Sequence, residues 1–218
     1  MPHPPGTPWL RLVLAVSLDG RLAPPEGGAA QLGGKGDRRA LEEALAWADG
    51  CLIGGETLRR HGTTCLIHAP DLLEERARQG RPSQPVAIAV SRRGQLPPEL
   101  PFFRQPLERW LLVAEAPSEP PTGYVRTLPL PDWHEALTQL ARLGLDRVAV
   151  LGGAALAASL LEADRLHELQ LTLCPRLLGG THLWLPPGAT RPGGSPWQLL
   201  EQRTLGGDEV LLRYGRGS

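Results

Sequence analysis

Two pairs of glycines carry the clearest chemical signal in the sequence. The apolar residues 51–53 run into Gly54-Gly55, and residues 148–151 run into Gly152-Gly153, with a helical pattern after each pair. A strand that enters a helix through glycine exposes the first N–H groups of that helix, where the helix dipole adds positive charge. Two such turns on neighbouring strands could bind one diphosphate, with Thr57 adding a hydroxyl. For either pair alone, a purely structural tight turn is the simpler interpretation.

The sequence lacks the other common phosphate and catalytic motifs. Neither glycine turn fits G-x-G-x-x-G, and no acidic residue lies at a strand end about twenty residues further on, which argues against a Rossmann site. The chain has no G-x-x-x-x-G-K-[ST] P-loop and no G-x-S-x-G elbow of a serine hydrolase. Its six histidines show no HxxxH, HxH or HExxH spacing, so we expect no metal site.

A second candidate site is Ser91-Arg92-Arg93, which directly follows the apolar run at residues 86–90. Ligands of open α/β sheets bind beyond the carboxyl ends of the strands. Two guanidinium groups and a hydroxyl at such a place suit a phosphate monoester, for example the 2′-phosphate of NADPH. The alternative is an exposed polar turn.

A third candidate follows the first apolar run, at residues 9–16. Ser17, Asp19 and Arg21 gather polar groups at the end of this strand, where an α/β enzyme places substrate contacts. An ordinary Asp-Gly turn would give the same pattern, and the sequence alone does not separate the two interpretations.

The elements that would position these groups alternate along the chain. Apolar runs predict strands at residues 9–16, 51–53, 86–90, 109–114, 124–128, 147–151 and 166–173. Helical patterns occupy residues 37–48, a stretch from residue 56, residues 133–143 and residues 154–161. Gly206-Gly207, between residues 197–205 and 209–214, indicates a closing hairpin. Helix and loop signals mix in residues 62–85.

This alternation predicts a three-layer α/β fold with a mostly parallel central sheet and a C-terminal antiparallel hairpin. No linker divides the chain, so we expect one domain over residues 1–218, with residues 1–8 flexible.

Composition excludes several classes of protein. The 218 residues carry 23 basic and 23 acidic side chains, which is unlike a nucleic-acid-binding protein. No apolar run reaches the ~18 residues of a membrane helix, and no signal peptide is evident. The three cysteines lack zinc or redox spacing. We therefore expect a cytoplasmic protein that binds a small molecule rather than nucleic acid or a membrane.

Several segments resemble one enzyme family. They are AVSLDGRLA (residues 15–23), WADGCLIGGETLRR (residues 47–60) and VAVLGGAALAASLLEADRLHELQLTLCPRLLGG (residues 148–180). These segments and the final strands are similar to the pyrimidine reductase domain of bacterial riboflavin biosynthesis, whose fold is shared with dihydrofolate reductase. The resemblance implies NADPH as hydride donor, a homodimer, and reduction of a ribosylamino-pyrimidinone 5′-phosphate. The candidate substrates are 5-amino-6-(5-phosphoribosylamino)uracil and its diamino-pyrimidinone relative.

The resemblance also implies roles for individual residues. Gly54 and Thr57 would contact the cofactor phosphates, as would Gly152, Gly153 and Ala154. The remaining assignments are Ser91 and Arg92 at the 2′-phosphate, Ala15 and Ser17 beside the nicotinamide, and Ser17, Asp19 and Arg21 toward the substrate. Glu168 would lie near the substrate ribose as candidate proton donor, with bound water as the alternative.

The region after Thr57 departs from the family pattern. The family continues into Asp-x-Pro and Leu-Thr-x-Arg, which hold the substrate, whereas this chain has residues 61–67, HGTTCLI. Glu56 replaces a small residue, and His167 replaces a frequent Asp. Three alternatives follow: a dihydrofolate- or pteridine-type reductase, a nucleotide-binding protein of this fold without catalysis, and a sugar-phosphate transferase or isomerase.

Overall fold

The computed structural model describes residues 6–28, 32–92, 94, 96–189 and 196–216. Its nine strands are β1 (Trp9–Ser17), β2 (Gly50–Gly54), β3 (Val86–Val90), β4 (Arg109–Val113), β5 (Arg126–Pro129), β6 (Arg147–Val150), β7 (Glu168–Cys174), β8 (Trp197–Gly206) and β9 (Glu209–Arg216). Its helices are α1 (Lys35–Trp47), α2 (Gly55–His61), α3 (Pro70–Arg78), α4 (Trp133–Arg142) and α5 (Ala154–Glu162), with a 3-10 turn at Pro101–Arg104. Of the segment predicted to be flexible, residues 1–5 lie outside the described residues.

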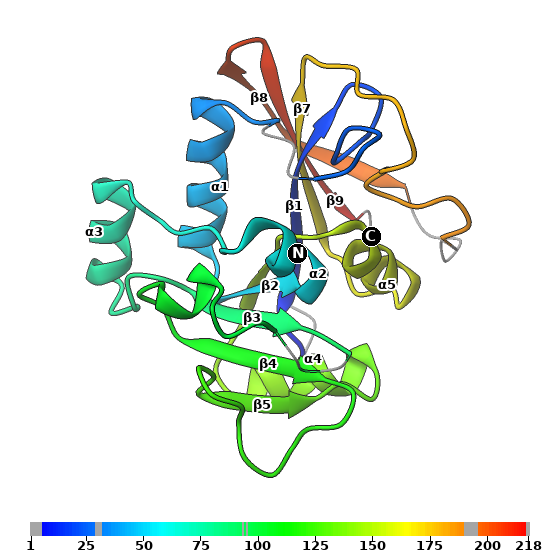
Figure 1. Ribbon diagram of the computed structural model, residues 1–218. Coiled ribbons are helices and arrows are strands. Elements are labelled where there is room, and N and C mark those ends of the chain that lie inside the picture. The colour runs from blue at the N-terminus through cyan, green and yellow to red at the C-terminus, as the bar shows by residue number, and fades with distance from the viewer. Residues whose placement is uncertain (1–5, 29–31, 93, 95, 190–195, 217–218) are drawn as a thin grey trace.

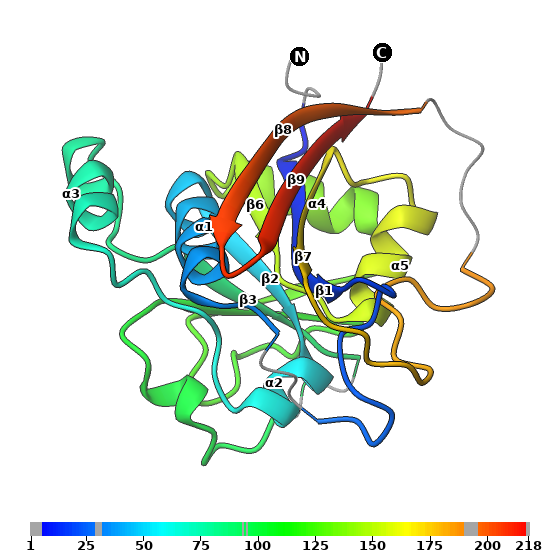
Figure 2. The same cartoon turned by 90° about the horizontal axis from the view of Figure 1, so that it is seen from above.

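The described strands form one sheet in the order β5-β4-β3-β2-β6-β1-β7-β9-β8. The strands from β5 to β7 are parallel, and β9 and β8 continue the sheet antiparallel at one edge (Figure 2). The predicted fold class, a mostly parallel sheet with a C-terminal antiparallel hairpin, is therefore confirmed.

Two apolar clusters pack against opposite faces of this sheet. Leu10 and Leu12 point into the cluster that α4 and α5 cover, and Val13 points into the one that α1 and α2 cover. Figure 1 shows α1 and α5 on opposite sides of β1. Because β1 is buried on both faces, its sequence is an almost continuous apolar run rather than an alternation.

The segment with mixed signals, residues 62–85, contains α3. This helix is attached through Arg76, whose side chain is fully buried and donates hydrogen bonds to the carbonyls of Ala46 at 3.0 Å and Ala48 at 2.8 Å. These carbonyls lie at the end of α1, where the helix dipole favours a cation. Such a tertiary anchor leaves no periodic pattern in the sequence.

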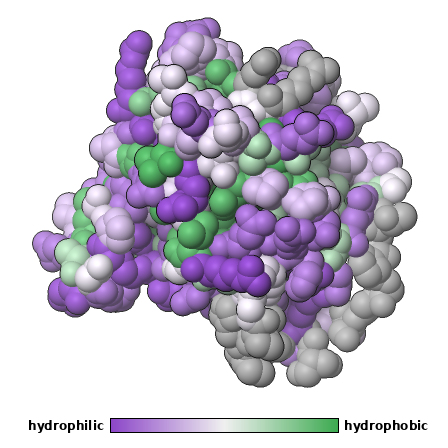
Figure 3. Space-filling model, turned by 90° about the horizontal axis from the view of Figure 1, so that it is seen from below, coloured by the Kyte–Doolittle hydropathy of each residue, from purple (hydrophilic) through white to green (hydrophobic). Residues whose placement is uncertain are grey.

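The surface is largely hydrophilic on the face shown in Figure 3, with apolar residues gathered in patches near its middle. Within the described part of the chain, no helix is long and apolar enough to cross a membrane.

Candidate active-site cleft

The two glycine turns lie side by side at the carboxyl edge of the sheet. Strands β2 and β6 are parallel neighbours, with Leu52 opposite Val150. The N–H of Gly54 donates a hydrogen bond of 2.9 Å to the carbonyl of Gly152, so the two turns are joined directly. Helix α2 follows the first turn and α5 follows the second. The two strands are therefore neighbours, as a shared diphosphate site would require.

Both residues of the second turn favour glycine. A Cβ on Gly153 would lie 3.0 Å from Thr57 Oγ1, closer than most such contacts in proteins. Gly152 has φ +84°, in the left-handed region that favours glycine. The backbone of the second turn thus stays bare at the point where the two helices begin.

A cleft of about 590 Å³ opens above these turns. This volume lies within the range of small-molecule sites. Its apolar wall includes Leu14 and Ala15 from β1, Leu22 from the following loop and Leu156 from α5. The size and composition suit a flat heterocyclic ring against the apolar wall.

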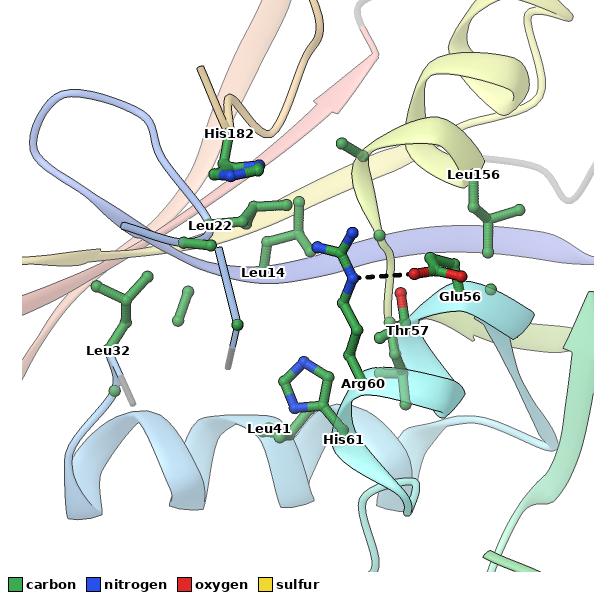
Figure 4. A pocket seen from close by; sticks show the side chains of 18 of the residues that line it. Leu14, Leu22, Leu32, Leu41, Glu56, Thr57, Arg60, His61, Leu156 and His182 are labelled. Carbon is green, nitrogen blue, oxygen red and sulfur yellow. Dashed lines mark hydrogen bonds and ion pairs between the residues drawn. The ribbon is translucent and has the colours of Figure 1, made fainter. Parts of the chain in front are cut away.

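Charged and polar side chains line the rest of the cleft. Glu56 and Arg60 of α2 form an ion pair of 3.1 Å. Figure 4 shows Arg60 reaching into the cleft near His61, with His182 on the opposite wall. Asp37, from the first turn of α1, also lines the cleft. The cleft therefore offers both cationic and acidic groups to a ligand.

The residues predicted to bind the cofactor divide into those that line the cleft and those that do not. Ala15, Gly54, Thr57, Gly153 and Ala154 all line the cleft.

Gly152 lies behind this surface, with its carbonyl bonded to Gly54. Ser91 and Arg92 are not among the described lining residues. Ser91 is buried and lies close to Gly55, where an added Cβ would be 3.2 Å from the Cβ of Ser91. Arg92 is exposed just beyond β3. Arg93 lies outside the described residues.

The three predicted substrate contacts at the end of β1 are hydrogen-bonded to one another and to the loop after β7. Ser17 Oγ donates to Asp19 Oδ1 at 2.5 Å and accepts the N–H of Arg21 at 2.8 Å. Asp19 also accepts the N–H groups of Leu178 and Gly179. The hydrogen bond from Ser17, followed by that from Gly179, lowers the pKa of Asp19 to about 2. None of the three is among the described lining residues, because these bonds tie the turn to the loop after β7.

Glu168 lies away from the cleft. It begins β7, opposite Arg11 near the start of β1, whereas the cleft is at the carboxyl ends of the strands. Its carboxylate accepts from Arg11 Nε at 2.6 Å and pairs with Arg213 at 3.3 Å. Glu168 is not among the described residues that line the cleft, and its role as proton donor stays a prediction.

Several groups that line the cleft belong to no motif in the sequence: Asp37, Arg38, Arg60, His61 and His182. Burial is the first cause that raises the pKa of Asp37, and the nearby Glu209 raises it further. An acidic residue in the first turn of a helix usually faces solvent and the dipole, so its sequence position gave no sign of burial. Asp37 is distant from the glycine turns along the chain, and the order of the strands in the sheet brings it to the cleft.

The sheet order and the cleft at its carboxyl edge define a protein of the dihydrofolate reductase-like fold class. Within this class, the chain belongs to the RibD C-terminal domain family, whose sequence model matches residues 8–211.

Several known proteins are similar to this chain. It is 26% identical over 223 residues to the riboflavin biosynthesis protein RibD of Escherichia coli, covering 96% of this chain and 60% of the relative. It is 25% identical over 183 residues to the 2,5-diamino-6-ribosylamino-4(3H)-pyrimidinone 5′-phosphate reductase of Methanothermobacter thermautotrophicus, covering 79% and 80%. The structure of Acinetobacter baumannii RibD superposes with a TM-score of 0.82 at 20% identity, covering 98% of this chain and 59% of that one. The chain thus spans about 60% of the length of these two bacterial RibD proteins.

Proposed function

We propose that this chain is an NADPH-dependent reductase of riboflavin biosynthesis that reduces a ribosylamino-pyrimidinone 5′-phosphate. The observation that carries the proposal is the pair of joined glycine turns at the base of the cleft. Membership of the RibD C-terminal domain family supports it. The archaeal relative is named for a substrate of this class.

The residues at the turns fit a dinucleotide. Gly153 and Ala154 bring the start of α5 into the cleft, and the hydroxyl of Thr57 lies beside them. The helix start suits a diphosphate, which a side chain on Gly153 would displace. Ser91 and Arg92, one strand further along the sheet, would bind the 2′-phosphate.

When bound, the cofactor supplies a hydride. The chain would orient the reacting rings against Leu14, Ala15 and Leu156 and keep water from this wall. Arg60 and His61 from α2, and His182 from the opposite wall, would face the substrate, in place of the Asp and Arg that the family has after Thr57.

We further propose one reductase domain that acts as a homodimer in the cytoplasm. The outermost strand β8 exposes 52% of Leu199 and 48% of Leu200, beside the partly buried Trp197. An isologous contact would cover these side chains. The three cysteines are free thiols, which suits a reducing compartment.

The deciding experiment follows the loss of dihydronicotinamide absorbance when the protein is mixed with NADPH and each of the two candidate pyrimidine ribosylamino phosphates. The proposal requires oxidation that depends on the substrate, with a ribityl product. Tight NADPH binding without turnover on either compound would instead support a binding protein of this fold.

A further inference from the structure

A glutamate lies at the edge of the backbone wall in the cleft. Glu56 is the second residue of α2 and directly precedes Thr57, the residue whose Oγ1 lies closest to Gly153. Its side chain lines the cleft and is 65% exposed, so a ligand can reach the carboxylate. In Figure 4 it lies beside Thr57, on the side of the cleft that Leu156 of α5 also lines. Glu56 is therefore next to the place where the two glycine turns meet.

Two arginines of the same helix orient the Glu56 carboxylate. Arg60 Nε donates a hydrogen bond to Oε1 at 3.1 Å, and Arg59 forms an ion pair with Oε2 at 3.5 Å. A carboxylate has about four acceptor sites, so further O–H or N–H donors can bind to both oxygens. The two arginines and one glutamate together carry a net positive charge, so this group of side chains still attracts an anionic cofactor.

The order of the strands indicates which half of a dinucleotide Glu56 would meet. The sheet contains the row β3-β2-β6-β1, and the proposed 2′-phosphate site follows β3 at one end of this row. The apolar wall proposed for the reacting rings comes partly from Leu14 and Ala15 of β1, at the other end. Glu56 lines the same cleft as this wall, whereas Ser91 and Arg92 are not among its described lining residues. Glu56 is thus on the nicotinamide side of the proposed diphosphate position.

The sugar on that side has the groups that suit a carboxylate. The ribose attached to nicotinamide carries two free neighbouring hydroxyls, whereas the adenosine ribose of NADPH carries a phosphate on its 2′-oxygen. An ionised carboxylate only accepts hydrogen bonds, and two adjacent O–H donors match its two oxygens. Hydrogen bonds to an ionised acceptor are stronger than those between neutral groups. An acidic side chain binds a ribose hydroxyl in the same way in Rossmann dinucleotide sites.

We propose that Glu56 is a specificity-determining residue that binds the 2′- and 3′-hydroxyls of the nicotinamide ribose. The glycine turns contact the cofactor at its diphosphate, and Glu56 adds a contact at the end of the cofactor that reacts. This contact limits rotation of the nicotinamide ring relative to the apolar wall. The inference rests on the proposed function, because it requires a nicotinamide dinucleotide in the cleft.

The test measures binding of three ligands to the full chain by calorimetric titration. They are NADP⁺, an NADP⁺ analogue without the 2′-hydroxyl of the nicotinamide ribose, and adenosine 2′,5′-bisphosphate. The parent should bind NADP⁺ about tenfold more tightly than the analogue, since one charge-assisted hydrogen bond is lost. Glu56→Ala should bind NADP⁺ and the analogue equally. Its affinity for adenosine 2′,5′-bisphosphate, which has no nicotinamide ribose, should equal that of the parent.

Two further variants separate the contact from other effects of the substitution. Glu56→Gln keeps one acceptor oxygen without the charge and should retain part of the preference for NADP⁺ over the analogue. Glu75→Ala is the matched control, because Glu75 on α3 also pairs with an arginine of its own helix, Arg78, at 3.9 Å. Glu75 is not among the described residues that line the cleft, so this variant should keep the full preference.

The possible failures of the inference and of the proposed function are distinct. Equal affinity of the parent for NADP⁺ and the analogue, or an unchanged preference in Glu56→Ala, would overturn the inference alone. Tighter binding of NADP⁺ by Glu56→Ala would also overturn it, because Glu56 would then act by repelling the diphosphate. Failure of the parent to bind NADP⁺ would overturn the inference together with the proposed function.

Discussion

The two walls of the cleft are built in different ways. The wall that the glycine turns form is made mostly of backbone. Each turn is a short local sequence between a strand and a helix. The opposite wall is made of side chains from α1, from the segment after β1 and from the loop after β7. The comparison shows that a backbone site leaves a pattern in the sequence, whereas a side-chain site depends on the register of distant strands.

Gly153→Val should have the largest effect on cofactor affinity, because it places a side chain on the wall that the glycine turns form. Gly153 has φ −83°, outside the left-handed region that favours glycine. The new side chain would fill the place proposed for the diphosphate, and NADPH affinity should fall at least about a hundredfold, roughly 2.7 kcal/mol. Calorimetric titration of the folded variant measures this.

The control for this substitution is Gly207→Val in the β8–β9 hairpin. Gly207 has φ +61° and open space around it, so valine should lower stability without a selective loss of cofactor affinity. A folded Gly153→Val protein that binds NADPH like the parent would show that the turn is only structural.

Glu168→Gln separates structural carboxylates from those of the cleft. Removing this charge leaves Arg11 and Arg213 close together with little access to water, so the free energy of unfolding should fall by roughly 2–3 kcal/mol. NADPH affinity and turnover should stay close to those of the parent. A selective loss of turnover, with unchanged denaturant midpoint, would restore Glu168 as a candidate proton donor.

Arg92→Ala tests how far the cofactor wall extends along the sheet. The parent should bind NADPH at least tenfold more tightly than NADH, since a charge-assisted contact to the 2′-phosphate contributes about 1.5–3 kcal/mol. The variant should lose most of this difference while its NADH affinity stays the same. If the parent binds both cofactors equally, residues 91 and 92 form only a polar turn.

Asp37→Asn should have the smallest effect of these substitutions, and it should raise stability where Glu168→Gln lowers it. The pKa of Asp37 is raised in the folded protein, so its ionisation opposes folding as pH rises above the ordinary value of 3.8. The variant should therefore have a slightly higher Tm at neutral pH, and the difference should disappear below pH 3.8. A lower Tm at neutral pH would mean that the carboxylate stabilises the fold.

The same contrast explains what the sequence could predict. The strands, the turn glycines and the closing hairpin were predictable because each is encoded by adjacent residues. Helix α3 was not, because its attachment is a hydrogen-bonded arginine, Arg76, that reaches the end of another helix. Asp19 was identified as polar and well placed, but only the structure shows that the loop after β7 uses its oxygens.

The hydrogen bond between Gly54 and Gly152 joins positions that are far apart along the chain. Under the proposed function, a chain in which β2 and β6 have not yet paired has no cofactor site at all. NADPH would then bind the native state alone and shift the unfolding equilibrium by mass action, by about 2.7 kcal/mol at a hundred times its dissociation constant. The supply of reduced cofactor in the cell would therefore govern how long this protein resists proteolysis, as well as how fast it works.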